Sequence, residues 1–446
     1  MEIFSVEGGY SLRGEVKVSG AKNVALKVLI ASLLTDEDVV IDNIPLISDV
    51  FSLIEVLRDL GVKITIEEDR HRIRVNALQI KMTSITSLKF SKLRASFLLL
   101  IPLLVRFGEV ELPFSGGDKI GVRPINRTLE GLQKMGAEVT YLEKTYLVKS
   151  KKLTGTTYRF EKNTHTGTEA LVMAAVLAQG QTVLENASQE PEVDELIRLL
   201  VSMGAQIKRR GRTVVITGVK VLSGGKIEIM SDRNEIVTFA AATLFTSGNV
   251  TIENVEHVHL EHFYKNLQLT GAQITKKTTS LHVNAENNFL KATRVKTSPH
   301  PGFMTDWQAP WAVLMTKAQG VSVVHETVFE KRFDYIEELI KMGAKIELFN
   351  PLVKDPYKVY NFDQVHYLGF HAIKIFGPQK LLGTELVIPD LRAGATLVLA
   401  ALGAEGQSIL LGIEHIDRGY EKFEQRLSQL GAKIKRERIN DQLKSF

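Results

Sequence analysis

A short phrase with one glycine recurs six times along the chain and dominates its hydrophobic pattern. Each copy follows residues with helical apolar spacing, as in VDELIRLLVSM, and precedes residues that alternate between apolar and polar. The copies are LGVKI, MGAEV, MGAQI, TGAQI, MGAKI and LGAKI, with glycines at Gly61, Gly136, Gly204, Gly271, Gly343 and Gly431. The pattern predicts helices that each end at a C-terminal glycine, and β-strands that follow them.

A second, strongly apolar phrase lies upstream of each glycine phrase. Its copies are VALKVLIASLL, RASFLLLIPLLV, TEALVMAAVLAQ, EIVTFAAATLF, QAPWAVLMTKA and GATLVLAALGA. These segments are apolar on nearly all sides, which predicts buried helices rather than amphipathic surface helices. Together with flanking strands such as KIEIMSD, they predict a βαβαββ unit, and six units of about 70 residues fill the chain.

This repeat predicts an α/β fold with an unusual layering. Helices that are apolar all round belong inside, with the sheets outside them, which is the reverse of a TIM barrel. Three units per domain predict two similar domains, with a boundary in the segment 221–230.

Composition narrows the class of protein. A chain of 446 residues with 44% hydrophobic and 24% charged residues is typical of a soluble protein with two or three domains. The absence of cysteine excludes disulfides, zinc–thiolate sites and a thiol nucleophile. The N-terminal MEIFSVEGGYSLRG lacks the pattern of a signal peptide, and the apolar stretch FLLLIPLLV is too short to span a bilayer. We expect a cytoplasmic protein that does not bind membranes.

The net charge of +5 has two explanations. One is a solvated basic surface, and the other is a site for anionic ligands. No run of Lys and Arg is interleaved with aromatic residues, so we do not expect nucleic-acid binding.

Charged residues recur in the connections between a strand and the following helix. The connections include SGAKN, SKLRAS, MSDRNE and IPDLRAG, and PFSGGDKIGVRP and EHIDRGYE later in their units. The residues concerned are Lys22, Asn23, Arg94, Asp118, Arg123, Lys162, Arg233, Asp306, Arg332, Asp390, Arg392 and Arg418. Repetition would bring them to one end of each domain, and two facing domains would enclose a cationic cleft. Helix N-termini there would add N–H donors and partial positive charge, which predicts a phosphate or diphosphate ligand. The alternative is that the arginines are solvated or pair with nearby acids.

Eight motifs in order carry a resemblance to a known family. They are VSGAKN, LRAS, GGDKIGVRP, ENASQEPE, PHPGFMTD, TVFEKRFD, DLRAGA and HIDRGYE. With them the chain resembles the UDP-N-acetylglucosamine 1-carboxyvinyltransferase (enolpyruvyl transferase) family. The resemblance implies the EPSP synthase-like fold of two inside-out α/β barrel domains, each of three βαβαββ units. It implies one domain at 21–229 and a second at 1–20 plus 230–446, because the N-terminal strand of this family crosses into the second domain.

The resemblance also implies a reaction. The family transfers the enolpyruvyl group of phosphoenolpyruvate to the 3′-hydroxyl of UDP-N-acetylglucosamine and releases phosphate, through a tetrahedral intermediate, as the first committed step of peptidoglycan synthesis. No metal or organic cofactor is needed. Two anionic substrates must be held together, so cations are required, and the chemistry needs an acid and a base.

Site residues follow from the matched motifs. The residues expected to bind phosphoenolpyruvate are Lys22, Asn23, Arg123, Arg332, Arg392 and Arg418. Those expected to bind UDP-N-acetylglucosamine are Asn23, Arg94, Arg123, Pro124, Ile125, Lys162, His165, Asp306 and Val328. The resemblance implies catalytic roles for Lys22, Asp118, Asp306 and Arg392, with Arg233 and Asp390 in support. Asp306 matches the base that takes the 3′-hydroxyl proton, and the alternative is a helix N-cap.

The catalytic loop 113–124 departs from the family pattern. Asp118 stands where the family usually has a cysteine that donates a proton and is alkylated by fosfomycin. Since a carboxylate is a poorer nucleophile than a thiolate, we expect resistance to fosfomycin. Lys119 and Arg123 would lower the pKa of Asp118, so we expect it to gain its proton only with substrate bound.

Three other functions remain open from the sequence. Transfer to shikimate 3-phosphate uses the same fold, but its usual Gly-Asn-Ala-Gly-Thr loop is missing here. An RNA 3′-phosphate cyclase would need a nucleophilic histidine near the C-terminus, whereas His415 lies in a motif that matches the enolpyruvyl transferases. A non-catalytic UDP-sugar-binding regulator would explain the missing cysteine, but it would not require Lys22, Asp306 and Arg418.

Overall fold

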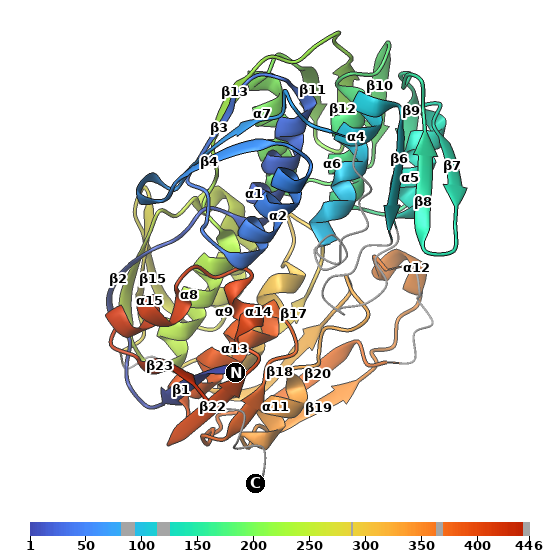
Figure 1. The fold of residues 1–446 in the computed structure, drawn as a ribbon. Coiled ribbons are helices and arrows are strands. Elements are labelled where there is room, and N and C mark those ends of the chain that lie inside the picture. Colours follow the sequence, from blue (N-terminus) through green and yellow to red (C-terminus); the bar gives the residue numbers. More distant parts are fainter. Residues whose placement is uncertain (82–93, 114–124, 287–288, 363–368, 440–446) are drawn as a thin grey trace. The chain divides into compact units, whose positions relative to one another are not determined.

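The computed structural model describes residues 1–81, 94–113, 125–286, 289–362 and 369–439 (Figure 1). They form two compact units. The first unit contains the described residues between Gly20 and Met230, and the second contains Met1–Ser19 and the chain from Ser231 onward.

The first unit has three sheets among its described residues. Their strand orders are β13-β3-β5-β4, β6-β8-β7 and β11-β12-β10-β9. The pairs β13–β3 and β9–β10 are parallel, and the other pairs are antiparallel. The strands are β3 (Val39–Asp42), β4 (Lys63–Glu67), β5 (Arg72–Asn76), β6 (Glu109–Pro113), β7 (Glu138–Tyr141), β8 (Thr145–Lys149), β9 (Thr157–Arg159), β10 (Gln181–Glu185), β11 (Gln206–Arg210), β12 (Thr213–Thr217) and β13 (Gly225–Glu228).

Helices of the first unit pack against one another between these sheets. Helix α1 contacts α2 and α7, and α6 contacts α4, α5 and α7. The helices are α1 (Lys22–Ala31), α2 (Ser48–Asp59), α4 (Leu100–Phe107), α5 (Asn126–Lys134), α6 (His165–Ala175) and α7 (Pro191–Ser202), with 3₁₀ turns η1 (Ser32–Leu34), η2 (Glu68–Arg70) and η3 (Arg94–Leu99).

The second unit repeats this plan with three four-stranded sheets among its described residues. Their strand orders are β15-β16-β14-β2, β17-β18-β20-β19 and β21-β22-β1-β23. The strands are β1 (Glu2–Glu7), β2 (Arg13–Lys17), β14 (Asn249–Glu253), β15 (Gln273–Lys276), β16 (Ser280–Asn284), β17 (Arg294–Lys296), β18 (Gly320–His325), β19 (Ile346–Phe349), β20 (Ala372–Gly377), β21 (Glu385–Val387), β22 (Gln407–Leu411) and β23 (Lys433–Arg438).

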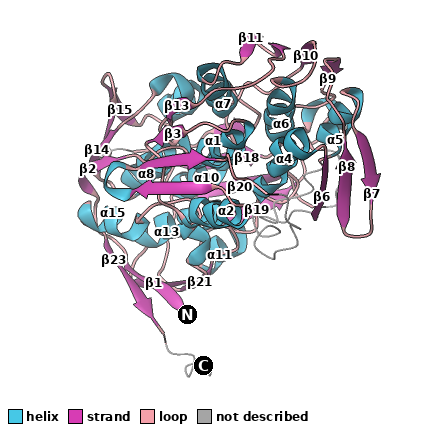
Figure 2. Ribbon diagram, turned by 45° about the horizontal axis from the view of Figure 1, so that its top comes forward, coloured by secondary structure: helices cyan, strands magenta, loops and turns pink. Residues whose placement is uncertain are grey.

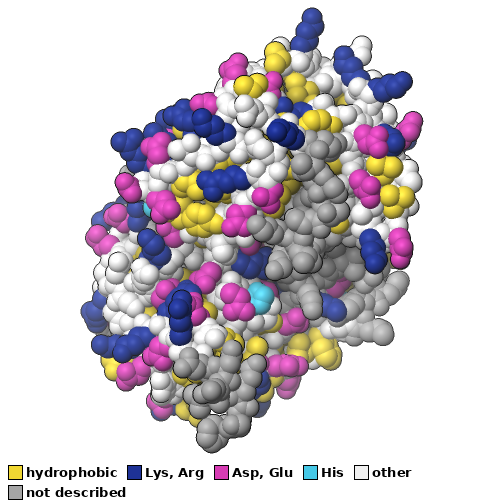
Figure 3. All heavy atoms as spheres, viewed as in Figure 1, with side chains coloured by type: hydrophobic (Ala, Val, Ile, Leu, Met, Phe, Trp, Pro, Cys, Tyr) yellow, Lys and Arg dark blue, Asp and Glu magenta, His cyan; other side chains and the backbone are white. Residues whose placement is uncertain are grey.

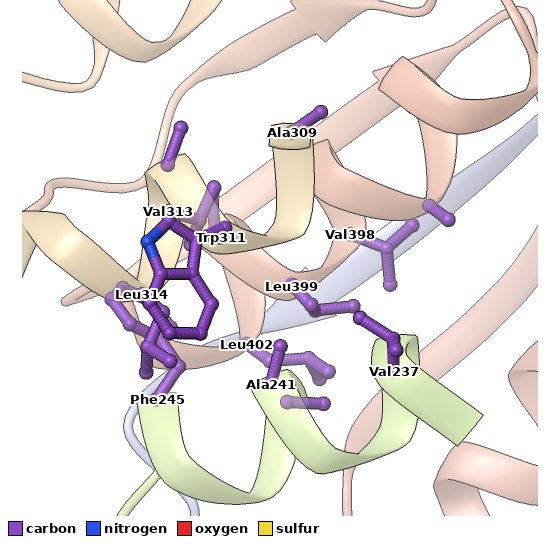
Figure 4. Close-up of a cluster of buried hydrophobic side chains, with 14 of the residues drawn as sticks. Val237, Ala241, Phe245, Ala309, Trp311, Val313, Leu314, Val398, Leu399 and Leu402 are labelled. Carbon is purple, nitrogen blue, oxygen red and sulfur yellow. The ribbon is translucent and has the colours of Figure 1, made fainter. Parts of the chain in front are cut away.

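The helices of the second unit include three that are buried almost completely. Every residue of α8 is buried, and α8, α10 and α13 contact one another (Figure 4). The helices are α8 (Arg233–Phe245), α9 (Glu261–Leu269), α10 (Gln308–Thr316), α11 (Ile336–Lys341), α12 (Pro356–Val359), α13 (Leu391–Gly403), α14 (Glu414–Asp417) and α15 (Phe423–Gln429), with 3₁₀ turns η4 (His257–Leu260) and η5 (Thr305–Trp307).

The structure confirms the predicted fold class of repeated units with buried helices and outer sheets. Side chains from α8, α10 and α13, including Val237, Trp311 and Leu399, fill the space among the three helices (Figure 4). Figure 2 shows the helices in cyan and the strands in magenta. A helix surrounded by other helices and a sheet has no solvent face, which explains its apolar sequence.

The six glycines of the repeated phrase confirm the predicted helix ends. Each has a positive φ, from 81° to 99°. This is the left-handed conformation that glycine adopts without a steric penalty, so the helix stops there and a strand can begin.

The N-terminal strand β1 lies in the interior of a sheet. It pairs in antiparallel fashion with β22 on one side and β23 on the other, for example Ile3 with Leu411 and with Glu437. The sheet therefore joins the first residues of the chain to its last described strand.

Acidic and basic side chains are interspersed on the face shown in Figure 3. This distribution favours a solvated surface as the source of much of the net charge. Within the described ranges, no helix has the length and apolar character needed to cross a bilayer.

Candidate active site

An ion-paired carboxylate, Asp306, lies at the centre of a cluster in the second unit. Arg332 donates through Nη2 to Asp306 Oδ1 at 2.9 Å, and Arg392 donates through Nε to Oδ2 at 3.2 Å. Both arginines are buried, and the Asp306 side chain is 19% exposed. Asp306 lies in η5 and caps no helix, so the N-cap alternative is wrong. The structure thus brings together three residues that were predicted for the site.

Burial and charge oppose each other in this cluster. Burial raises the pKa of Asp306, but Arg392 and Arg332 outweigh it and hold that pKa below its ordinary value. Burial lowers the pKa of Arg332, but Asp306, Asp390 and Glu326 outweigh it, so the net shift is upward. At neutral pH the cluster therefore holds an ionised carboxylate between two guanidinium groups.

Helix α13 and a tyrosine fix the orientation of Arg392. The Asp390 carboxylate caps α13 by accepting from the backbone N–H groups of Arg392 at 2.8 Å and Ala393 at 3.1 Å. Arg392 Nη1 donates to the Tyr420 hydroxyl at 3.2 Å, which lies 2.9 Å from Thr238 Oγ1. These contacts leave the guanidinium little rotational freedom, and they give Asp390 its role as a helix cap.

A further acid, Glu326, is buried and interacts electrostatically with Arg332. Its Oε2 accepts from Thr305 Oγ1 at 2.8 Å, and its Oε1 accepts from the backbone N–H groups of Val328 at 2.7 Å and Phe329 at 3.1 Å. Burial raises the pKa of Glu326, although Arg332 and these hydrogen bonds lower it in part. Glu326 thus connects the residue before Asp306 to the loop that contains Val328.

The first unit holds a buried ion pair at the start of α1. Lys22 Nζ lies 2.6 Å from Asp49 Oδ2, and each side chain is 8% exposed. Lys22 is the first residue of α1, and Asn23, which is half-buried, is the second. Both predicted residues therefore lie at a helix N-terminus, where the partial positive charge favours anions.

A three-residue ionic contact joins α1 to α6 in the same unit. Glu169 Oε1 lies 3.0 Å from His165 Nε2 and 3.4 Å from Lys27 Nζ. Glu169 is fully buried. Burial lowers the pKa of His165, but the charge of Glu169 outweighs it, and the net shift is upward. The predicted sugar-site residue His165 is thus held by a carboxylate one turn further along its own helix.

The other predicted residues are spread over both units. Ile125 is buried and precedes α5, and Arg94 begins η3. Lys162, Val328 and Arg418 are half-buried in loops or at a helix end. Buried Arg233 starts α8, and its Nη1 lies 3.1 Å from His300 Nδ1. Asp118, Arg123 and Pro124 lie outside the described residues.

Four partners of the predicted residues were missed in the sequence: Asp49, Glu169, Glu326 and Tyr420. Tyr420 follows Arg418 closely in the HIDRGYE motif, so its place in that motif was an available signal. Glu169 offered the i, i+4 spacing from His165. No comparable local signal marked Asp49, because its contact comes from another helix.

The described residues contain no group of three His, Asp or Glu side chains arranged to hold a metal ion. The chemistry that the two clusters offer is that of paired cations and carboxylates: anion binding and proton transfer.

Residues 6–427 match the family model described as EPSP synthase (3-phosphoshikimate 1-carboxyvinyltransferase). The chain belongs to this family of enolpyruvyl transferases. The match extends over both units, so the repeats and the clusters described above belong to one family pattern.

Relatives in the family are similar over 90% or more of their length. Proteins named UDP-N-acetylglucosamine 1-carboxyvinyltransferase are 39% identical in Bartonella tribocorum, over 98% of this chain and 99% of that protein, and 40% in Koribacter versatilis, over 98% and 96%. The protein of that name in Prochlorococcus marinus is 41% identical, over 96% of this chain and 90% of its own.

Solved structures share the fold at lower identity. The enolpyruvyl transferase NikO from Streptomyces tendae has a TM-score of 0.86 at 22% identity, over 98% of this chain and 99% of its own. EPSP synthase from Acinetobacter baumannii has a TM-score of 0.72 at 19% identity, over 98% and 100%. Both are enolpyruvyl transferase folds, which agrees with the repeated units seen here.

Proposed function

We propose that this chain transfers the enolpyruvyl group of phosphoenolpyruvate to the 3′-hydroxyl of UDP-N-acetylglucosamine and releases phosphate. The identity of 39–41% over nearly the whole chain to relatives named for this reaction carries the proposal. The reaction is addition followed by elimination, through a tetrahedral intermediate. It is the first committed step of peptidoglycan synthesis, and we place it in the cytoplasm.

In the second unit, Asp306 is the proposed base for the 3′-hydroxyl. Its contacts with Arg332 and Arg392 support this role, because they hold the carboxylate ionised and in one orientation. The same two arginines are proposed to bind the carboxylate of phosphoenolpyruvate, which a planar guanidinium can do through two parallel hydrogen bonds. Arg418 is proposed to bind the phosphate.

In the first unit, Lys22 is the proposed point contact for the phosphate of phosphoenolpyruvate. Its place at the first position of α1 supports this role, because the helix N-terminus favours the same anion. Asn23, Lys162, His165 and Ile125 are proposed to bind the UDP-sugar. These assignments need no metal and no organic cofactor.

The remaining roles fall to residues of the catalytic loop 113–124, to Arg94 and to the Val328 loop. Asp118 is proposed as the acid that protonates the enol carbon, and Arg123 as a phosphate ligand. Pro124, Arg94 and the Val328 loop are proposed to contact the UDP-sugar.

Phosphate release tests the function directly. The protein is given phosphoenolpyruvate with UDP-N-acetylglucosamine, or separately with shikimate 3-phosphate, and we expect release only with the first. Release only with the second would change the acceptor to the one in the family description. If phosphate is released with neither acceptor but calorimetry shows binding of UDP-N-acetylglucosamine, the protein is a non-catalytic UDP-sugar-binding protein and the proposed reaction is wrong.

A further inference from the structure

We propose that Glu326 is a positioning residue that fixes Asp306 and the Val328 loop in one arrangement for catalysis. The inference rests on the proposed function, since it assigns Asp306 to the hydroxyl proton and Val328 to the sugar. Glu326 itself contacts no reacting atom in this assignment and acts through the segments it holds.

One carboxylate holds two separate segments of the chain. Both oxygens of Glu326 are used: Oε1 accepts from two consecutive backbone N–H groups, those of Val328 and Phe329, and Oε2 accepts from the Thr305 hydroxyl. Two donors on one oxygen determine the path of the loop, because both N–H groups must point at the same atom. The third contact then places η5, which carries Asp306, relative to that loop.

Thr305 is held from two sides. Its hydroxyl bonds to Glu326, and its carbonyl accepts from Arg332 Nη2 at 3.3 Å, the same nitrogen that donates to Asp306. The residue before the base is therefore fixed through side chain and backbone. A small rotation of Thr305 would move the Asp306 carboxylate, and catalytic rates are sensitive to displacements of about 1 Å.

The backbone of Glu326 is anchored to the sheet. Glu326 follows β18 directly, and its N–H donates to the His371 carbonyl, next to β20, at 2.8 Å. A site is more accurately positioned on a rigid element than on a loop. The Glu326 side chain thus ties two segments outside the sheet, η5 and the Val328 loop, to a residue that the sheet holds in place.

Burying the Glu326 carboxylate costs solvation free energy, which a purely structural contact would not require. The residue is 1% exposed, and a carboxylate taken out of water loses solvation that its hydrogen bonds must replace. An apolar side chain would fill this space without that cost, but it would hold neither the two N–H groups nor the Thr305 hydroxyl. The acid is therefore explained by the groups that it positions.

Steady-state kinetics of Glu326→Ala, Glu326→Gln and Thr305→Val test the inference. We expect Glu326→Ala to lower kcat about tenfold or more and to raise KM for UDP-N-acetylglucosamine. Glu326→Gln should restore both to within about threefold, because the amide oxygen still accepts from Val328 and Phe329 and the amide nitrogen can donate to Thr305. Thr305→Val, a small change that keeps the shape, should lower kcat and leave KM for the UDP-sugar unchanged.

Glu338→Ala is the matched control. Glu338 is also a buried glutamate of this unit that accepts from a backbone N–H, that of Val387 at 3.0 Å, but its contacts lie on α11 and β21. We expect a lower Tm and unchanged kcat and KM. If Thr305→Val and Glu326→Ala also lower only the Tm, the inference is overturned. Absence of turnover in the wild-type protein would instead overturn the proposed function and this inference with it.

Discussion

At the residue scale, Asp306 is subject to two opposing requirements. Its contacts with Arg332 and Arg392 keep it ionised, but the same cations lower its pKa and make it a weak base. In the proposed reaction a substrate carboxylate approaches those arginines. Sharing them with a second anion would raise the pKa of Asp306, so we expect its basicity to increase when phosphoenolpyruvate is bound.

Replacing Asp306 by Asn tests its role. The amide keeps the shape but cannot take a proton, so we expect kcat to fall by about 10²–10⁴-fold in the phosphate-release assay. Asp355→Asn is the control, because Asp355 caps α12 through the Lys358 N–H and Asn is an equally good cap. Turnover of Asp306→Asn at the wild-type rate would exclude Asp306 as the base.

The carboxylate at position 118 predicts resistance to fosfomycin. A carboxylate attacks an epoxide less readily than a thiolate, so mass spectrometry of the wild-type protein with fosfomycin should show no adduct. The Asp118→Cys variant, in the same chain, should gain one adduct per molecule. A stoichiometric adduct on the wild-type protein would contradict the prediction.

Much of the candidate site could be predicted as residue types at motif positions, but not as contacts. The motifs named Asp306, Arg332 and Arg392, and the structure brings these three together. The contact of Glu326 with Thr305 and that of Asp49 with Lys22 could not be predicted, because a carboxylate that meets its partner through tertiary packing leaves no spacing signal in the sequence.

At the element scale, the contact among His165, Glu169 and Lys27 fastens α6 to α1. Since α1 begins with Lys22 and α6 begins with His165, this contact connects two helices whose first residues are proposed to bind different substrates. Removing Glu169 would leave the buried Lys27 and the half-buried His165 without their shared carboxylate. Removing one partner of a buried ion pair is strongly destabilising in other proteins.

The raised pKa of His165 makes this contact depend on pH. A histidine whose pKa is raised on folding contributes stability in full below its unfolded pKa of about 6.5 and loses that contribution as pH rises through the folded pKa. The Tm of the wild-type protein should therefore exceed that of His165→Gln most at pH 6, and the difference should shrink towards pH 9. His262→Gln, at an exposed histidine of α9, should show no such trend.

A substitution at Gly204 tests the role of the glycine that ends the second helix of each repeat. Its φ is +99°, and an added Cβ would meet nothing closer than Ser223 Oγ at 3.8 Å, so the cost of Gly204→Ala is that of the backbone alone. We expect a loss of about 1–2 kcal/mol in urea unfolding. Gly204→Asn should lose less, since Asn tolerates this conformation better. Equal stability of the Ala variant would contradict the role of the glycine.

The sequence pattern predicted these elements well but missed how one of them begins. The apolar segment RASFLLLIPLLV, which contains Pro102, is predicted as one helix, whereas its first six residues form the 3₁₀ turn η3 and the α-helix α4 begins only at Leu100. Proline lacks the N–H for an i−4 hydrogen bond and clashes with that carbonyl, so it is accommodated in the first turn of a helix. The spacing of apolar residues alone does not show where a proline forces the α-helix to begin.

At the scale of the whole molecule, the strand β1 completes a sheet that otherwise consists of strands near the C-terminus. Phe4 on β1 is fully buried, and Arg436 of β23 lies over its ring at 5.0 Å. We expect Phe4→Ala to cost about 3–5 kcal/mol in denaturant unfolding. The partly exposed Ser5 hydroxyl, also on β1, accepts from the Gln407 side chain at 2.9 Å. We expect Ser5→Ala to lower the free energy of unfolding by less than about 1 kcal/mol. Similar losses for both variants would contradict the tight packing of the Phe4 ring in this unit.

The position of β1 also determines when its sheet can form during synthesis. Residues 2–7 leave the ribosome long before their two neighbours, which begin at Gln407 and Lys433. At about 5–20 residues per second, translation takes roughly 20 to 80 s to reach them. The first unit, between Gly20 and Met230, can fold during this interval, whereas β1, which is translated before that unit, acquires its hydrogen bonds only after it.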